Sequence, residues 1–130
     1  MDNLVMIKDS KRFFKTPDVS CNIETGKCEI IGESFMENSG AFFERIFEWI
    51  TNYNQEYSHK PLVIDIKLTY FNTSTSKMLF ELLNLIQNIS IEGQKVEVNW
   101  YYDTSDEEVY EDIIDLCYDV DLKVNIIPQN

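Results

Sequence analysis

Apolar and polar residues alternate in two neighbouring stretches, Val19 to Glu24 and Lys27 to Ile31. A period of two is typical of a β-strand with one buried face, and the Thr25-Gly26 pair between the stretches is typical of a tight turn. We therefore expect a β-hairpin with a two-residue turn. Its register pairs Glu24 with Lys27, Ile23 with Cys28 and Cys21 with Ile30.

Three longer stretches carry apolar residues at spacings of three and four, which predicts amphipathic helices. They run from about Gly40 to Tyr57, Ser74 to Ile91 and Asp106 to Tyr118. Asn38 or Ser39 is a suitable N-cap for the first. The expected buried faces are Phe42, Phe43, Ile46, Phe47, Ile50 and Tyr53; Met78, Leu79, Leu82, Leu83, Ile86 and Ile89; and Val109, Ile113, Ile114 and Cys117.

Three β-forming runs follow the helices: Leu62 to Leu68, Lys95 to Tyr101 and Leu122 to Ile127. The first is almost continuously apolar, which predicts a central strand covered on both faces. The order is hairpin, helix, strand, helix, strand, helix, strand. With right-handed crossovers, this order predicts an α/β fold in which three helices pack on a mixed β-sheet with an N-terminal β-hairpin.

No stretch rich in Pro, Gly or Ser divides the chain, so a single domain is expected over residues 1–130, with residues 1–10 loosely ordered and Lys11 to Thr16 extended. The net charge of −12 opposes binding to DNA, RNA or an anionic membrane, because each requires clustered cations. No apolar run approaches the roughly 18 residues of a membrane helix, and no signal peptide is evident. We therefore expect a cytoplasmic protein.

The chain has three cysteines, Cys21, Cys28 and Cys117. An odd number without a signal peptide favours reduced thiols. In the expected hairpin, Cys21 and Cys28 share a face without being direct partners. This arrangement predicts apolar packing in the core.

Four hydroxyl residues in a row, Thr73 to Ser76, lie where a predicted strand ends and a predicted helix begins. One interpretation is capping by Asn72 or Thr73, with the other hydroxyls bonded to first-turn N–H groups. The second is a phosphorylation site, because the partial positive charge at a helix N-terminus favours a phosphoryl group. Lys77, one turn after Thr73, supplies a nearby cation.

Aromatic residues at strand ends are candidates for a partner-binding surface. Tyr70 and Phe71 flank the hydroxyl residues, and Trp100-Tyr101-Tyr102 ends the next predicted strand. If the two strands run parallel, Tyr101 and Tyr102 lie at the same sheet end as Thr73. Their alternative role is packing.

An acidic segment precedes and enters the third predicted helix. Its carboxylates are compatible with a solvated helix start and face, a partner-facing acidic patch, or a Ca²⁺ or Mg²⁺ site. The spacing does not match an EF-hand loop, so we expect no metal. The residues are Asp103, Asp106, Glu107, Glu108, Glu111, Asp112 and Asp115.

The sequence lacks the motifs of common enzyme classes. It has no Gly-rich phosphate loop, no Gly-x-Ser-x-Gly elbow and no Cys/His pair in a recognisable motif. The one histidine, His59, is expected in a solvated loop. We therefore expect no catalytic residues, no cofactor and no enzymatic activity.

Three blocks resemble the signature blocks of the SiaC family of bacterial regulatory phosphoproteins. The resemblance extends from about Thr16-Pro17 to the last predicted strand. The blocks are Gly32-Glu33-Ser34-Phe35-Met36-Glu37-Asn38, Leu68-Thr69-Tyr70-Phe71-Asn72-Thr73-Ser74-Thr75-Ser76-Lys77-Met78-Leu79 and Val96-Glu97-Val98-Asn99-Trp100-Tyr101-Tyr102-Asp103.

The resemblance implies a fold like the STAS domains of anti-sigma-factor antagonists. It implies phosphorylation of Thr73, with Ser74 as the next candidate, by a GHKL-type serine/threonine kinase, and reversal by a PP2C-type phosphatase. It further implies that the unphosphorylated form binds a partner, which in the best-known pathway is a diguanylate cyclase that makes cyclic di-GMP. The expected partner-binding residues are Tyr70, Phe71, Asn72, Thr73, Ser74, Lys77, Tyr101 and Tyr102.

Two alternatives remain open from the sequence. Besides the phosphorylated partner-binding switch, they are an anti-sigma-factor-antagonist-type regulator and a scaffold subunit in which the hydroxyl residues only cap a helix. An exposed Thr73 favours a switch, whereas a buried hydroxyl bonded within its own helix turn favours the scaffold.

Overall fold

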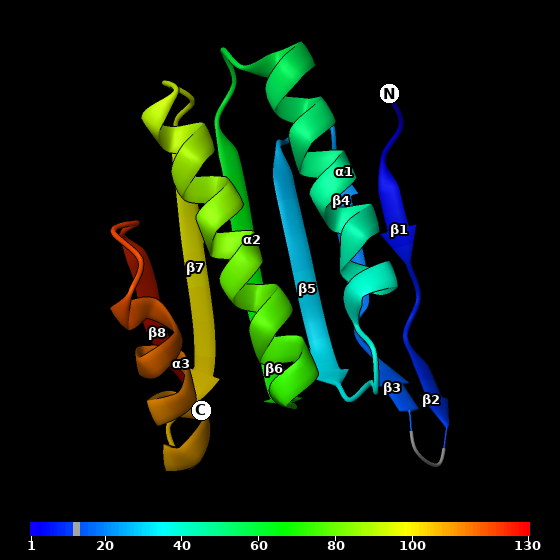
Figure 1. Ribbon diagram of the computed structural model, residues 1–130, viewed down its shortest axis with the longest axis vertical. Helices are drawn as coiled ribbons and strands as arrows, with labels where there is room; N and C mark the ends of the chain where they lie inside the picture. Colours follow the sequence, from blue (N-terminus) through cyan, green and yellow to red (C-terminus); the bar gives the residue numbers. More distant parts are fainter. Residues whose placement is uncertain (12–13) are drawn as a thin grey trace.

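The computed structural model describes residues 1–11 and 14–130. Five strands come first along the chain, and helices and strands alternate after them (Figure 1). The elements are β1 (Leu4–Met6), β2 (Asp9–Lys11), β3 (Phe14–Thr16), β4 (Asp18–Asn22), β5 (Lys27–Ser34), α1 (Gly40–Tyr57), β6 (Leu62–Phe71), α2 (Thr73–Ile91), β7 (Val96–Asp103), α3 (Glu107–Tyr118) and β8 (Val124–Gln129).

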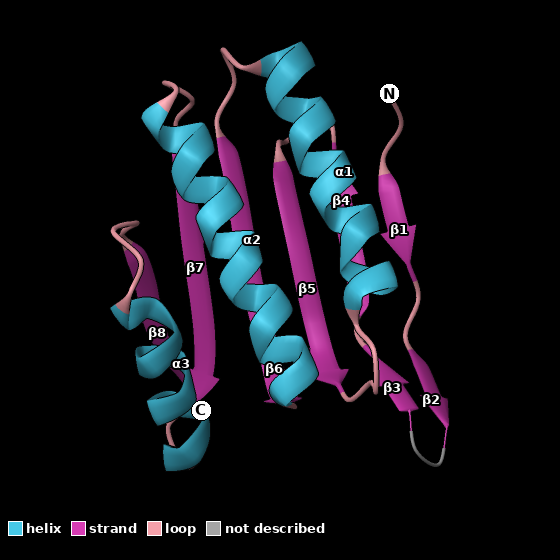
Figure 2. Ribbon diagram, in the orientation of Figure 1, coloured by secondary structure: helices cyan, strands magenta, loops and turns pink. Residues whose placement is uncertain are grey.

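Six strands form one mixed sheet in the order β1-β4-β5-β6-β7-β8. Strand β4 pairs antiparallel with β1 and β5, whereas β5, β6, β7 and β8 pair in parallel. The three helices lie side by side over the sheet (Figure 2). The predicted α/β domain, with a mixed sheet and three helices, is confirmed. No helix in the described part of the chain is long and apolar enough to cross a membrane.

The described helices cover only one face of the sheet (Figure 2), so the prediction that β6 is covered on both faces is wrong. Alternate residues of β6, such as Ile64 and Ile66, are fully buried in the core beneath the helices. Asp65 and Lys67, which follow these two isoleucines, point to the opposite, helix-free face. The run misled because Asp65 and Lys67 look like breaks in an apolar stretch, whereas their spacing of two marks a polar face.

Polar side chains join four strands across the helix-free face. The Asp65 carboxylate forms a salt bridge with Lys27 at 3.1 Å and accepts a hydrogen bond from the Asn99 amide at 3.0 Å. The Asn125 amide donates to the Asn99 side-chain oxygen at 3.0 Å. Asp65 also raises the pKa of Lys27, first through their hydrogen bond and then through its charge. These contacts compensate for burying the Asp65 side chain.

Strands β4 and β5 form the predicted hairpin, but the predicted register is wrong. Asn22 pairs with Lys27, so the connection has four residues rather than two. The Asn22 side-chain oxygen accepts the backbone N–H groups of Glu24 and Thr25, and its carbonyl accepts that of Gly26. An asparagine turn of this kind lengthens the loop, and the Thr25-Gly26 pattern alone does not reveal it.

The observed register makes Cys21 and Cys28 direct cross-strand partners. Their Cα atoms are 3.9 Å apart and a disulfide joins them. The prediction of reduced, unpaired thiols at these positions is therefore wrong, whereas their predicted burial is confirmed. Cys117 is a free thiol, and burial raises its pKa.

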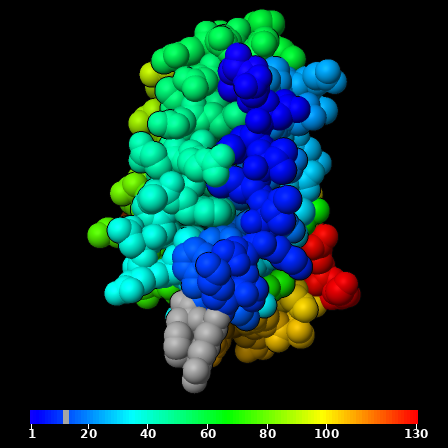
Figure 3. Space-filling view, turned by 90° about the vertical axis from the view of Figure 1, so that its right-hand side faces the viewer, coloured from blue at the N-terminus to red at the C-terminus, as the bar shows by residue number. Residues whose placement is uncertain are grey.

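The first ten residues are more ordered than predicted. Strand β1 pairs with β4, Met6 is buried, and the Trp49 indole N–H donates to the carbonyl oxygen of Asp2 at 3.1 Å. In Figure 3 the N-terminal segment, in dark blue, runs down the face that is turned towards the viewer. Strands β2 and β3 pair with each other, so the predicted extended segment Lys11–Thr16 is confirmed on either side of residues 12–13, which lie outside the described residues.

Most element ends agree with the predictions. Helix α1 has the predicted bounds, whereas β6 continues to Phe71 and β8 begins at Val124. Ser39 occupies the N-cap position of α1 without a side-chain capping bond. The Asn38 side chain instead accepts the N–H of Gly40 at 3.0 Å.

Two neighbouring isoleucines of β5 test which face of this strand lies beneath the helices. Ile30 is fully buried, whereas Ile31 lies on the helix-free face and is 39% exposed. Ile30→Ala is expected to lower the free energy of unfolding by about 2–5 kcal/mol, because it leaves a cavity. Ile31→Ala is expected to lower it by less than about 1 kcal/mol. Urea unfolding followed by circular dichroism measures both, and equal losses would contradict this assignment of the two faces of β5.

Candidate functional site

The candidate site lies where β6 ends and α2 begins. Asn72 is extended there, and its side-chain oxygen accepts the N–H of Thr75 at 3.1 Å. Asn72 is therefore the N-cap of α2, one of the two residues predicted for this role. Its amide also donates to the carbonyl oxygen of Met36 at 2.8 Å, so the cap holds the loop between β5 and α1.

The hydroxyl residues after Asn72 occupy different environments. Thr75 is completely buried, and its hydroxyl shares a 2.7 Å hydrogen bond with that of Ser34 at the end of β5. The Ser74 hydroxyl bonds to the Ser39 hydroxyl at 2.8 Å and accepts the Ser39 N–H at 3.1 Å. These four residues, Ser34, Ser39, Ser74 and Thr75, form a hydroxyl clasp that holds the β5–α1 loop against the start of α2.

Thr73 does not belong to the hydroxyl clasp. Its side chain is exposed, and its hydroxyl has no hydrogen-bond partner within the described residues. The backbone N–H groups of Thr73 and Ser74 also lack an acceptor in this part of the chain. Unpaired donors at the positive end of a helix dipole favour an added anion. This environment suits a phosphoacceptor better than a capping hydroxyl.

Two exposed aromatic rings lie beside the start of α2. Phe35 and Tyr70 are exposed, and their ring centroids are 6.2 Å apart. Phe35 belongs to the loop held by the hydroxyl clasp, and Tyr70 precedes the N-cap by two residues. Lys77, one helical turn after Thr73, is also exposed. The site therefore combines an unpaired hydroxyl, a cation and apolar surface.

A β-bulge determines which aromatic ring of β6 is exposed. The pairing of β6 with β5 skips Thr69, and an extra residue reverses the alternation of side chains. Tyr70 consequently points outwards. Phe71 turns into the core, where it is 6% exposed and its ring centroid lies 6.0 Å from that of Trp100. The expectation that Phe71 contributes to a partner-binding surface is therefore wrong.

Tyr101 and Tyr102 lie on opposite faces of the sheet, so they do not share one docking surface. Strands β6 and β7 run parallel, as the expectation required, but successive residues of β7 alternate between faces. Tyr101 lies on the helix-free face, with the Lys67 ammonium 4.8 Å from its ring centroid. Tyr102 packs against Tyr110 of α3, with the ring centroids 4.9 Å apart.

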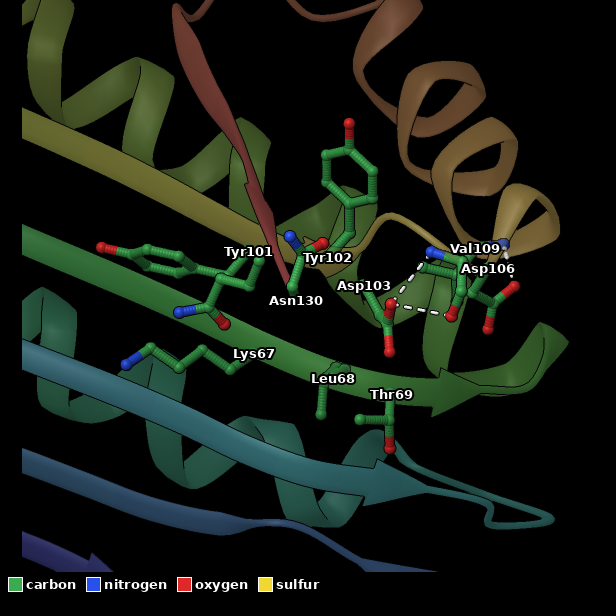
Figure 4. A pocket seen from close by; sticks show the side chains of 11 residues that line it. Lys67, Leu68, Thr69, Tyr101, Tyr102, Asp103, Asp106, Val109 and Asn130 are labelled. Atoms are coloured by element: carbon green, nitrogen blue, oxygen red, sulfur yellow. Dashed lines mark hydrogen bonds between the residues drawn. The ribbon is translucent and has the colours of Figure 1, made fainter.

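A pocket of about 320 Å³ opens beside the C-terminal ends of β6, β7 and β8 (Figure 4). Its Asp103 carboxylate accepts hydrogen bonds from the N–H and hydroxyl of Ser105, at 2.9 and 2.8 Å. These bonds lower the pKa of Asp103. A carboxyl group that serves as a general acid near neutral pH needs the opposite shift. The pKa shift of Asp103 therefore does not suit a general acid.

The acidic segment begins α3 as predicted. Asp106 is the N-cap and accepts the N–H of Val109 at 3.0 Å, while Glu107 and Glu108 occupy the first turn. The helix dipole favours carboxylates at these positions. Among the described residues, no three His, Cys, Asp or Glu side chains form a group able to hold a metal ion. His59 is exposed after α1, as predicted.

Sequence reasoning did not identify Ser34, Phe35 and Ser39 as parts of the site. One signal for Ser34 and Phe35 was available, because both lie in the block of residues 32–38 that resembles the SiaC family. No local pattern in that block shows what these residues contact. The end of β5 contacts the start of α2 because β5 and β6 are parallel neighbours, so that both strands end at the same edge of the sheet.

Comparison with known proteins identifies relatives of this chain. A family model described as "SiaC family regulatory phosphoprotein" matches residues 7–129. An uncharacterised protein of Pseudomonas aeruginosa strain UCBPP-PA14 is 30% identical over 96 residues, which are 74% of this chain and 75% of that protein. The similarity therefore includes most of both sequences.

Solved structures agree with the sequence comparison. The crystal structure of apo-SiaC from Pseudomonas aeruginosa matches with a TM-score of 0.85 and 25% identity, covering 98% of this chain and 99% of that chain. SiaC in the crystal structure of the diguanylate cyclase SiaD with its activator SiaC, from the same organism, matches with a TM-score of 0.82 and 25% identity, covering 95% and 100% of the two chains. The chain belongs to the SiaC family of regulatory phosphoproteins.

Proposed function

We propose that this chain is a phosphorylation-controlled binding protein without enzymatic activity, and that Thr73 is its phosphoacceptor. A GHKL-type serine/threonine kinase adds the phosphoryl group and a PP2C-type phosphatase removes it. The unphosphorylated form, with a STAS-like fold, binds and regulates a diguanylate cyclase. The solved complex of SiaD with its activator SiaC supports this class of partner.

The exposure of Thr73 is the observation that carries the proposal. A kinase must reach the hydroxyl, and modification must leave the fold intact. Thr73 is exposed, and its hydroxyl makes no hydrogen bond within the described residues. A phosphoryl group on Ser74 would instead replace a hydroxyl that bonds to Ser39 in the hydroxyl clasp. These environments favour Thr73 over Ser74.

The cap geometry argues against the scaffold alternative. Asn72 already supplies the side-chain cap of α2. The Thr73 hydroxyl therefore has no capping role to perform. An anti-sigma-factor-antagonist-type regulator would use the same site and differ in its partner.

Phosphorylation would change the electrostatics of the site more than its fold. A phosphoryl group adds about −1.5 to −2 charges at neutral pH, on a chain whose net charge is already −12. The dipole of α2 stabilises this charge in the free protein. In a complex, the same dianion beside Tyr70 and Phe35 would lose its water, at a large desolvation cost. The modified protein therefore stays folded and releases its partner.

Intact-mass measurement tests the acceptor. Incubation with Mg-ATP and a lysate of the native host is expected to add one phosphoryl group to the wild type and none to Thr73→Ala. Ser76→Ala, which removes a neighbouring hydroxyl outside the hydroxyl clasp, is the matched control and should be phosphorylated normally. Phosphorylation that persists in Thr73→Ala would reject this acceptor. If another kinase substrate is modified in that lysate but this chain is not, the scaffold alternative is favoured.

Two threonine variants test the separation of structural and signalling hydroxyls. Thr75→Val is expected to lower the free energy of unfolding by about 1–3 kcal/mol, because it leaves the buried Ser34 hydroxyl without a partner. Thr73→Val should change it by less than about 0.5 kcal/mol. The double variant Ser34→Ala/Thr75→Val should recover part of the loss. Urea unfolding measures all three, and an equally large loss in Thr73→Val would assign Thr73 a structural role.

Binding measurements test the surface around Thr73. Thr73→Glu and Tyr70→Ala are each expected to weaken binding to a diguanylate cyclase of the native host by about tenfold or more, through charge and lost apolar contact. Thr51→Glu places the same charge at an exposed position of α1 and should leave the Kd unchanged. Isothermal titration calorimetry gives the three values. Wild-type affinity in both site variants would show that the partner binds elsewhere.

A further inference from the structure

Helix α3 carries a row of apolar side chains on its exposed side. Its buried residues Val109 and Ile113 pack in the core. Tyr110, Ile114 and Tyr118 follow one another at intervals of four residues and therefore lie in one row along the helix. All three are exposed, Tyr118 by 85%. Exposed apolar rows of this kind on a helix are typical of binding surfaces.

A row of carboxylates runs beside these apolar residues. Glu107, Glu111 and Asp115 each precede one of them by three positions, and all three are exposed. None forms a salt bridge with another residue in the described ranges 1–11 and 14–130. Helix α3 contains no Lys, Arg or His. The six residues of the two rows, Glu107, Tyr110, Glu111, Ile114, Asp115 and Tyr118, are called here the α3 surface.

The folding of the free chain does not account for this row of carboxylates. Glu107 lies in the first turn, where the helix dipole favours negative charge. Asp115 lies in the last turn, where the dipole opposes it. Like charges four residues apart, such as Glu107 with Glu111 and Glu111 with Asp115, repel each other along the helix. A cationic partner would remove both penalties.

We propose that the α3 surface docks a basic amphipathic helix of a partner protein. The apolar side of that helix would cover Tyr110, Ile114 and Tyr118, and its Lys or Arg residues would face the row of carboxylates. A second copy of this chain would bring carboxylates against carboxylates, and a nucleic acid or an anionic membrane would be repelled. Charge complementarity therefore selects this occupant. The surface lies on α3 and does not include Thr73.

A synthetic helical peptide is the probe for this proposal. It has Leu at every third or fourth position and Lys on the remaining faces, and a scrambled peptide of the same composition is its control. Fluorescence anisotropy with the full chain at physiological salt is expected to show binding of the amphipathic peptide at least about tenfold tighter than that of the scrambled one, because only the first presents an apolar row.

Variants of the chain separate the α3 surface from general charge attraction. Tyr118→Ser removes apolar surface without changing charge, and Glu111→Lys/Asp115→Lys reverses two carboxylates. Each is expected to weaken peptide binding by about tenfold or more. Glu44→Lys/Glu48→Lys makes the same charge change at exposed positions of α1 and is the matched control, expected to weaken it by about twofold or less. Circular dichroism checks that each variant is folded.

Four results of the binding and sedimentation experiments would overturn the proposal. They are no binding of the amphipathic peptide, equal binding of the scrambled peptide, equal loss in the α1 control, and a dimer of this chain that sedimentation shows to be broken by Tyr118→Ser. Amide chemical shifts of the labelled chain provide an independent map. Peptide-induced shifts on α3 would support the proposal, and shifts confined to the start of α2 would reject it.

Discussion

The buried hydrogen bond between the hydroxyl groups of Ser34 and Thr75 fastens the start of α2 to the end of β5. Both groups are removed from water, so each is tolerated there only because the other is its partner. The parallel pairing of β5 with β6 brings the two segments to one edge of the sheet. Asn72 then caps α2 and holds the carbonyl of Met36. These contacts fix the start of α2 in the orientation that leaves Thr73 exposed.

Two threonines that are two positions apart, Thr73 and Thr75, therefore have different environments. The Thr75 hydroxyl is committed to a buried bond that the fold needs, whereas the Thr73 hydroxyl is exposed and makes no bond among the described residues. The environment of each group, rather than its identity, decides which one is available to a modifying enzyme. The start of α2 adds a second distinction, because its dipole would stabilise a phosphoryl group on Thr73 in the free protein, whereas a bound partner would have to remove water from that group.

Local patterns predicted the helices and the class of fold, because apolar periodicity in α1, α2 and α3 is long and regular. The errors arose where a single side chain or an extra residue changed the geometry. The Asn22 side chain lengthened the hairpin turn, and the bulge at Thr69 turned Phe71 inwards. No local pattern marks Ser34 and Ser39 as site residues, because their partners lie on a distant segment that only the sheet topology brings near.

Alternation of apolar and polar residues cannot distinguish a strand register from one displaced by two residues, because both keep the apolar side chains beneath the helices. Asp65, Asn99 and Asn125 lie directly opposite one another on β6, β7 and β8, and their hydrogen bonds form only in the native alignment. A displaced strand would leave the buried Asp65 carboxylate without the Asn99 amide, at a substantial desolvation cost. The polar residues of the helix-free face thus help to specify the alignment of the parallel strands. They destabilise misaligned pairings in which the apolar side chains would still be buried.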